Sequence, residues 1–326
     1  MLRATIIDSA PQVGNRMKSL LIHLLVLGAG LCGAPGAFAL VGGPGVAPNT
    51  ADSPWAGVGS LKVGNAYFTG TLIAPGYVLT AAHVVAGQNP SALTFQLNAG
   101  ASSTFAASAI FVNPDYTGTA SGNLPGDPTA HDDIAIVRLS GDVAAGIPVY
   151  DRYGGNLLGR NLSFVSYAGS PTVKTIGENR ADLLIPDPSG TDEVYLFDFD
   201  GPDLTTNRIG QNVPANGTLG ADREASLIGG DSGSAAFVFA NGAWQLAGIN
   251  TFRLSFAAGP AEAGLFGTGG GGIILSAYTP WINGVIANPV PEPDTVPMLL
   301  AGLGVLAFLV RRKKAADAML RTNDSR

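Results

Sequence analysis

The sequence predicts an all-β protein. From about residue 40 onward, short apolar and β-branched runs alternate with turns rich in Gly, Pro, Asn and Asp, a spacing typical of sandwiches and barrels. The chain contains 45 Gly and 22 Pro among its 326 residues, and no long segment has helical periodicity. The predicted strands include Val78–Thr80, Leu93–Leu97, Ile134–Leu139, Asn161–Tyr167, Glu193–Phe197 and Gln245–Asn250. One short helix is predicted to begin at Thr279-Pro280, with Thr as N-cap and Pro at the first position.

Composition narrows the class of protein further. Hydrophobic residues make up 46% of the chain, which is enough for a sizeable core, and charged residues only 13%. The net charge of −6 argues against a nucleic-acid partner. The single cysteine, Cys32, lies in a segment that we expect to be removed, so the mature protein would have no disulfide. We expect no cofactor and no metal, and we interpret the acidic stretch Asp198–Asp203 as a turn because it lacks the spacing of a calcium loop.

The N-terminal region has the pattern of a secretory signal peptide. Arg16 and Lys18 precede an apolar run from Leu20 to Leu31, and small residues follow up to Ala37-Phe38-Ala39. We therefore expect a signal peptide over residues 17–39, cut by signal peptidase, and an upstream extension of the reading frame over residues 1–16. The alternative is an uncleaved membrane anchor.

The C-terminal region, residues 287–326, has three parts in sequence. Val290-Pro291-Glu292-Pro293 comes first, then an apolar helix predicted over residues 296–310, then the basic cluster 311–314. The apolar run is shorter than the roughly 18–20 residues of a typical spanning helix. The combination resembles the PEP-CTERM sorting signal of Gram-negative bacteria. This resemblance implies an exosortase-type partner enzyme, transient membrane association, and delivery to the cell envelope, the surface or the extracellular matrix. The alternative is an ordinary C-terminal anchor.

Three motifs between these ends carry chemistry. His83 follows Thr80-Ala81-Ala82, Asp133 opens the run Asp133–Leu139, and Ser232 lies within Gly230–Gly233. A serine hydroxyl needs a base to act as a nucleophile, and a carboxylate orients that base. Asp132, next to Asp133, is a rival for the carboxylate. The order His, Asp, Ser differs from that of α/β-hydrolases and subtilisins.

Over residues 40–286 the chain resembles the trypsin/chymotrypsin family of serine endopeptidases. The phrase Asp-Ile-Ala after residue 132 matches the family and selects Asp133. The resemblance implies a chymotrypsin-like double β-barrel with the boundary near residues 145–160, and a catalytic triad of His83, Asp133 and Ser232. It also implies that the backbone N–H groups of Gly230 and Ser232 form the oxyanion hole, and that an acyl-enzyme intermediate forms on a protein or peptide substrate.

The resemblance extends to activation. Cleavage after Ala39 would expose Leu40-Val41-Gly42-Gly43, which is similar to the family's activated Ile-Val-Gly-Gly terminus. By that resemblance, the new amine of Leu40 would pair with Asp231, so the signal-peptide cut would also be the activating cut.

The substrate pocket is also inferred from the resemblance. Ser226 would lie at its base, and Thr251, Phe252 and Arg253 along its wall. Because Ser226 is neutral, we do not expect a preference for Lys or Arg. Arg253 could narrow the pocket or attract an acidic side chain, and it could equally point to solvent.

Two other functions are compatible with the sequence. The first is a catalytically weak trypsin-fold protein that binds at a surface or in a matrix, since Arg253 and Ser234 depart from the family pattern. The second is a hydrolase of another kind, which would need a different fold.

Overall fold

The computed structural model describes residues 22–24, 40–118, 123–124, 130–209, 217–256 and 264–288. The chain divides into two compact units, residues 1–280 and 281–326. Apart from 22–24, the expected signal peptide lies outside the described residues, as do the upstream extension and the predicted helix 296–310. Of the second unit, the structure describes the greater part of helix α2 (Thr279–Ala287) and Asn288.

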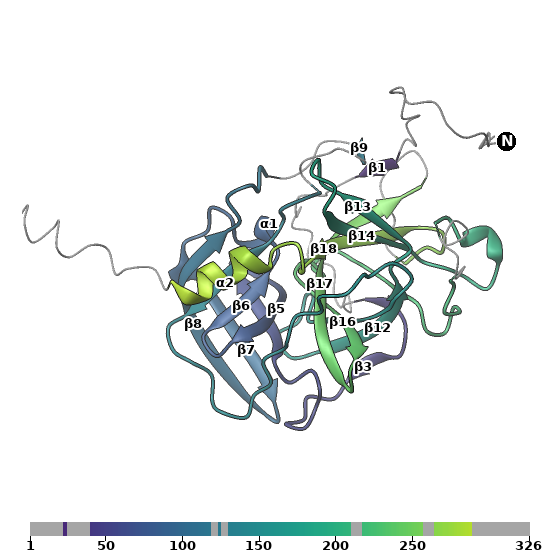
Figure 1. The fold of residues 1–326 in the computed structure, drawn as a ribbon. Coiled ribbons are helices and arrows are strands. Elements are labelled where there is room, and N and C mark those ends of the chain that lie inside the picture. Colours follow the sequence, from purple (N-terminus) through teal and green to yellow (C-terminus); the bar gives the residue numbers. More distant parts are fainter. Residues whose placement is uncertain are drawn as a thin grey trace, which may run out of the picture. The chain divides into compact units, whose positions relative to one another are not determined.

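The first half of unit 1 is a closed antiparallel barrel, whose strands carry the blue colours in Figure 1. The strand order is β10-β6-β5-β4-β7-β8, and β10 closes the barrel because it pairs with both β6 and β8. Large apolar side chains such as Leu61, Leu79 and Phe95 fill the interior and are fully buried. The strands are β4 (Val58–Val63), β5 (Ala66–Ala74), β6 (Tyr77–Thr80), β7 (Leu93–Ala99), β8 (Ala101–Val112) and β10 (Ala135–Leu139).

The second half of unit 1 is a sheet of order β13-β14-β18-β17-β16-β11-β12-β3. The sheet curls around its own core, because Phe164 on β11 and Phe197 on β14 meet with ring centroids 5.0 Å apart although their strands are not neighbours. Asn179 Nδ2 on β12 also donates to the carbonyl oxygen of Asp198 on β14 at 2.8 Å. The strands are β3 (Gly45–Ala47), β11 (Asn161–Ser166), β12 (Lys174–Arg180), β13 (Leu183–Pro186), β14 (Asp192–Asp198), β16 (Ala235–Ala240), β17 (Ala243–Ser255) and β18 (Gly269–Ile274).

Several short elements complete the described chain. They are β1 (Ile22–Leu24), β2 (Val41–Gly42), α1 (Ala82–Val85), the 3-10 turns η1 (Pro90–Ala92) and η2 (Leu204–Thr206), β9 (Asn123–Leu124) and β15 (Ala225–Ser226). Strand β2 pairs with β15, while β1 pairs with β17 and β9.

The chain passes from the barrel to the curled sheet between Leu139 and Asn161. Within this connection the hydroxyl of Tyr150 accepts from the Gly57 N–H at 3.1 Å and donates to the Pro54 carbonyl at 2.8 Å, so it fastens the connection to the barrel.

The predicted fold class is confirmed: the described chain is mainly β, it contains a β-barrel, and it ends in a short helix that begins at Thr279. Each of the six predicted strands overlaps a strand of the structure. These segments were predictable because alternating apolar residues and flanking turn residues are local signals.

Candidate active site

His83 and Asp133 reach the same place because their strands are neighbours. The hairpin of β5 and β6 ends at Thr80, and His83 follows within the single turn of α1. Asp133 lies just before β10, whose first residue Ala135 pairs with Thr80. Asp133 Oδ1 accepts from the His83 backbone N–H at 2.8 Å, and Asp133 Oδ2 lies 2.6 Å from His83 Nδ1.

Ser232 arrives from the other half of the fold. Its Oγ lies 2.7 Å from His83 Nε2, so the imidazole bridges a carboxylate and a hydroxyl with its two ring nitrogens. Both distances lie within the range for hydrogen bonds. The side chain of His83 is 16% exposed and that of Asp133 only 9%, so solvent and ligands approach the imidazole more readily than the carboxylate.

The surroundings of His83 raise the pKa of its imidazole. Burial by itself lowers the pKa of His83, while the charge and the hydrogen bond of Asp133 raise it, and the net direction is upward. Burial and the charge of Asp133 together raise the pKa of the nearby Tyr116 hydroxyl. The negative charge of Asp133 therefore acts on its surroundings, as a group that stabilises an imidazolium would.

The contact to His83 is made by Asp133, whereas Asp132 has other partners. Asp132 adopts a left-handed backbone conformation with φ of 62°, and its N–H donates to the Tyr278 hydroxyl at 3.0 Å.

The serine loop packs closely against the His83 hairpin. Gly233 has φ of +80°, and a Cβ there would lie 2.3 Å from Thr80 Oγ1 and 2.5 Å from the Thr69 carbonyl. A side chain at this position would therefore push Ser232 away from His83. Ser234, where the sequence departs from the family, is fully buried, and its Oγ accepts from Asn250 Nδ2 at 2.9 Å. The motif-based reasoning did not find Asn250, because no local pattern marks it.

Asp231 is buried beneath the serine loop and has three donors. Its Oδ2 accepts from the N–H groups of Leu40 at 3.3 Å and Ile228 at 2.7 Å, and its Oδ1 accepts from the Ser166 hydroxyl at 2.6 Å. Burial raises the pKa of Asp231 to about 6, although these hydrogen bonds and the charge of Arg253 lower it. The structure thus brings together Leu40 and Asp231, as predicted from the motifs, and adds Ser166, which they did not indicate.

The residues predicted for the substrate pocket lie around this loop. Ser226 is buried on β15, opposite Val41 of β2. Thr251 and Phe252 are each 6% exposed on β17, and within the described chain the Thr251 hydroxyl oxygen has no hydrogen-bond partner. Arg253 pairs with Gly270 of β18 and is half-buried. Its charge lowers the pKa of Asp231.

Gly230 precedes Asp231 with φ of +101°, a conformation that disfavours any residue with a Cβ. A Cβ there would also lie 3.2 Å from the Ala168 side chain. This conformation sets the direction of the peptide groups next to Ser232.

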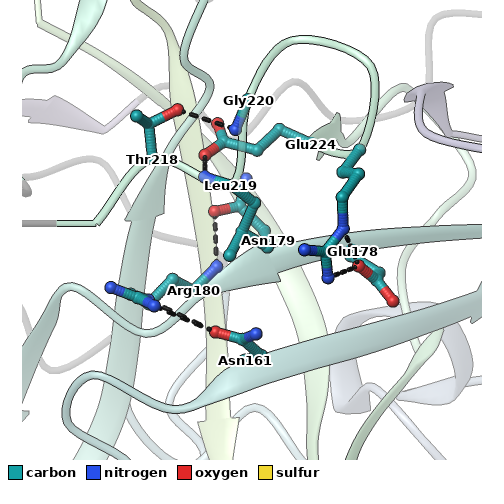
Figure 2. A network of polar contacts seen from close by, with 9 residues as sticks. Asn161, Glu178, Asn179, Arg180, Thr218, Leu219, Gly220 and Glu224 are labelled. Atoms are coloured by element: carbon teal, nitrogen blue, oxygen red, sulfur yellow. Dashed lines mark hydrogen bonds and ion pairs between the residues drawn. The ribbon is translucent and has the colours of Figure 1, made fainter.

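Four buried carboxyl groups lie behind the predicted pocket base. Asp182 follows β12, Asp198 is the last residue of β14, Asp200 follows β14, and Glu224 directly precedes β15. Figure 2 shows Glu224 turned back into its own loop, where it accepts from the Leu219 N–H at 2.7 Å. Glu178 accepts from Arg223 Nε at 2.8 Å and anchors the same loop to β12. Asn179 Nδ2 donates to the carbonyl of Ala225, next to Ser226, at 3.0 Å.

Three of these groups, Asp182, Asp200 and Glu224, have pKa values raised above the usual range, so they hold protons more tightly in the folded chain. Burial and the charge of Asp198 raise the pKa of Asp182, and burial with the charges of Asp198 and Glu224 raises that of Asp200 to about 7. Within the described residues, Asp182 Oδ1 and Asp200 Oδ1 have no hydrogen-bond partner. Nowhere in the described ranges do three or more His, Cys, Asp or Glu side chains form a group suited to a metal ion.

The cluster predicts that the protein loses stability as the pH rises. An unfolded aspartate has a pKa near 3.9. Between about pH 4 and the raised pKa values of the folded chain, the folded state therefore binds more protons than the unfolded state. The free energy of unfolding should therefore decrease over this window, and Asp182→Asn, which mimics the neutral acid, should weaken the decrease. Urea denaturation at pH 5, 7 and 9 measures it. The exposed Asp187→Asn is the control, and equal pH slopes for wild type and Asp182→Asn would contradict the prediction.

A surface groove of about 400 Å³ contains none of the predicted site residues. It is lined by Gly159, Arg160, Asn161, Ser163, Glu178, Val238, Phe239 and Trp244. In the part of the chain that the structure describes, no helix is long and apolar enough to cross a membrane.

Comparison with known families agrees with this geometry. The trypsin family model matches residues 41–156, which include His83 and Asp133. The model for the PEP-CTERM protein-sorting motif matches residues 289–314. Both matches lie on the same chain, and Ser232 lies beyond the residues that the trypsin model matches.

No curated protein sequence matches the chain. Among solved structures, a double mutant of human heparin binding protein (CAP37) is similar, with a TM-score of 0.51 and 16% sequence identity. The match covers 77% of this chain and 100% of that protein. At this identity, the likeness shows a shared fold.

Proposed function

We propose that the chain is an exported serine endopeptidase. The observation that carries the proposal is the His83 imidazole, with Asp133 Oδ2 at 2.6 Å from one ring nitrogen and Ser232 Oγ at 2.7 Å from the other. A nucleophile, its base and a group that orients the base are the parts that acyl transfer requires. The trypsin-family match supports the same conclusion for residues 41–156.

The proposed reaction has two halves. Ser232 Oγ attacks the carbonyl carbon of the scissile peptide bond while His83 Nε2 takes the hydroxyl proton. The tetrahedral intermediate collapses, the C–N bond breaks, and His83 gives that proton to the leaving amine. Water, deprotonated by His83, then hydrolyses the acyl-enzyme and restores the Ser232 hydroxyl.

Two further parts of the site lower the energy of this path. Asp133 fixes the imidazole in the tautomer that leaves Nε2 free to accept, and its charge stabilises the imidazolium. The backbone N–H groups of Gly230 and Ser232 are proposed to bind the oxyanion, and losing one such donor costs roughly 3–4 kcal/mol in other enzymes. The left-handed conformation of Gly230 supports this role because it orients the peptide groups beside Ser232.

The proposed substrate is a peptide without a strong requirement for Lys or Arg before the cut bond. Ser226, at the proposed pocket base, is neutral and buried. Arg253 adds positive charge near the proposed pocket wall, and this charge also lowers the pKa of Asp231.

A second candidate function is binding without catalysis. It is favoured by the similarity to heparin binding protein, whose name describes a binding activity. An active-site fluorophosphonate separates the two functions, because it forms a covalent bond only with an activated serine. Labelling of the wild type that disappears in Ser232→Ala supports the endopeptidase, and an unlabelled wild type supports the binding protein.

Export is proposed to activate the enzyme. Leu40 is buried, and its N–H already donates to Asp231. Leu40 also has φ of 52°, which costs a residue with a side chain about 1–2 kcal/mol. Cutting the Ala39–Leu40 bond would remove this torsional constraint and place an ammonium beside the Asp231 carboxylate. Signal peptidase would thereby create the terminus that stabilises the serine loop.

N-terminal sequencing of the exported protein is therefore expected to begin at Leu40. Asp231→Asn should lower activity in the mature protein, because the new ammonium then lacks its carboxylate. A fully active protein that starts several residues away from Leu40 would overturn the activation proposal and leave the triad proposal untouched.

The sorting motif at residues 289–314 supports export to the cell surface in Gram-negative bacteria. We propose that an exosortase-type enzyme recognises this segment and that the trypsin domain acts at the envelope or in the extracellular matrix.

A further inference from the structure

We propose that Tyr278 and the His131–Glu193 pair are positioning residues that hold Asp133 in register with His83. This inference rests on the proposed function and adds residues outside the triad. The two residues before Asp133 are each held by a side chain from the second half of the fold. Glu193 of β14 contacts the His131 side chain, and the Tyr278 hydroxyl accepts from the Asp132 N–H.

The backbone that presents Asp133 is strained. Asp132 has φ of 62°, in the left-handed region that residues with a Cβ rarely adopt. The Ile134 N–H donates to the Asp132 carbonyl at 2.7 Å, so Asp133 is the central residue of a three-residue turn. Strained backbone persists only where the surrounding structure holds it in place.

The first holding contact is the Tyr278 hydroxyl. It accepts from the Asp132 N–H at 3.0 Å, so a backbone donor in the strained segment has a fixed partner. Tyr278 is 5% exposed, and burial together with the charges of Asp132 and Glu193 raises the pKa of its hydroxyl. The hydroxyl therefore stays protonated and neutral, and it can donate in turn to the Asp132 carboxylate.

The second holding contact is the hydrogen-bonded pair of His131 and Glu193, one residue before Asp132. His131 Nδ1 lies 2.8 Å from Glu193 Oε2, and the two side chains are only 9% and 14% exposed. Little solvent reaches this contact, so water competes weakly with it. His83 and Asp133 come from the first half of the fold and Ser232 from the second, so contacts that cross between the halves beside Asp133 preserve the alignment of the triad.

The test compares two tyrosine-to-phenylalanine variants in the full exported chain. Both Tyr278 and Tyr150 are buried, and each hydroxyl bonds a backbone group of another segment. Tyr278→Phe should slow fluorophosphonate inactivation on the order of 10- to 100-fold, as small displacements of catalytic groups do. Tyr150→Phe should leave the inactivation rate unchanged even if it lowers stability by a similar amount.

The pH profile of inactivation separates positioning from general stability. Asp133 raises the pKa of His83, so a displaced Asp133 should move the acidic limb of the profile to lower pH. We expect this shift in Tyr278→Phe and, to a smaller extent, in Glu193→Gln and His131→Gln. The double variant Glu193→Gln/His131→Gln should be no worse than the single ones, because each removes the same contact.

Two results have distinct meanings. If wild type is inactivated and Tyr278→Phe matches Tyr150→Phe in both rate and pH profile, the positioning role is wrong while the proposed function stands. If wild type itself does not react with the fluorophosphonate, the proposed function fails, and the positioning role fails with it.

Discussion

Replacing Ser232 with alanine is expected to abolish labelling by a fluorophosphonate and to lower kcat/KM for peptide hydrolysis by about a millionfold. The substitution removes only the hydroxyl group, whose oxygen lies 2.7 Å from His83 Nε2. Alanine is smaller and fits the same loop, whose shape depends on Gly233 rather than on the serine side chain. The thermal midpoint should therefore change little while activity disappears.

The companion experiment is His83→Ala, alone and combined with Ser232→Ala. Residues that act as one unit do not contribute independently, so the double variant should be about as slow as either single variant. Ser163→Ala, at a half-exposed serine on β11, is the matched control and should keep full activity. Hydrolysis of a mixed peptide library, followed by mass spectrometry, measures the four variants beside wild type. Activity in Ser232→Ala equal to that of wild type would refute the proposed mechanism.

The second large effect is expected at Asp133. Asp133→Asn should lower kcat/KM by about ten-thousandfold, because an amide in this position favours the wrong imidazole tautomer. Asp133 contacts both the backbone N–H and the Nδ1 of His83, so its removal leaves the ring without orientation. Asp132→Asn keeps the backbone N–H that Tyr278 accepts, and it should lower kcat/KM by less than about tenfold.

These two variants test the choice between adjacent carboxylates. The measurement is the kcat/KM of each variant between pH 6 and pH 9, with hydrolysis of one peptide from the library. Because the charge of Asp133 raises the pKa of His83, the acidic limb of the Asp133→Asn profile should lie at lower pH than that of wild type. A large loss in Asp132→Asn together with a small loss in Asp133→Asn would reverse the assignment.

Local patterns account for much of the fold. Strands such as β6, β7 and β10 were predictable because each is a short apolar run bounded by turn residues. Helix α2 begins at the predicted Thr279 because Pro280 fits the first helical turn. The closure of the barrel and the curl of the second sheet were not predictable from such patterns. They depend on pairings between distant strands, such as β10 with β8.

The sequence by itself determined the chemistry that is available: a serine between glycines, a histidine after a β-hairpin, and an aspartate before a buried strand. Short motifs carry this information because backbone conformation and side-chain type are local properties. Only the tertiary structure decided that Asn250 donates to Ser234, that Ser166 donates to Asp231, and that Asp132 donates to Tyr278 across 146 positions of the chain. Those choices depend on contacts between segments far apart in the sequence, and such contacts exist only once the two halves of the fold have packed.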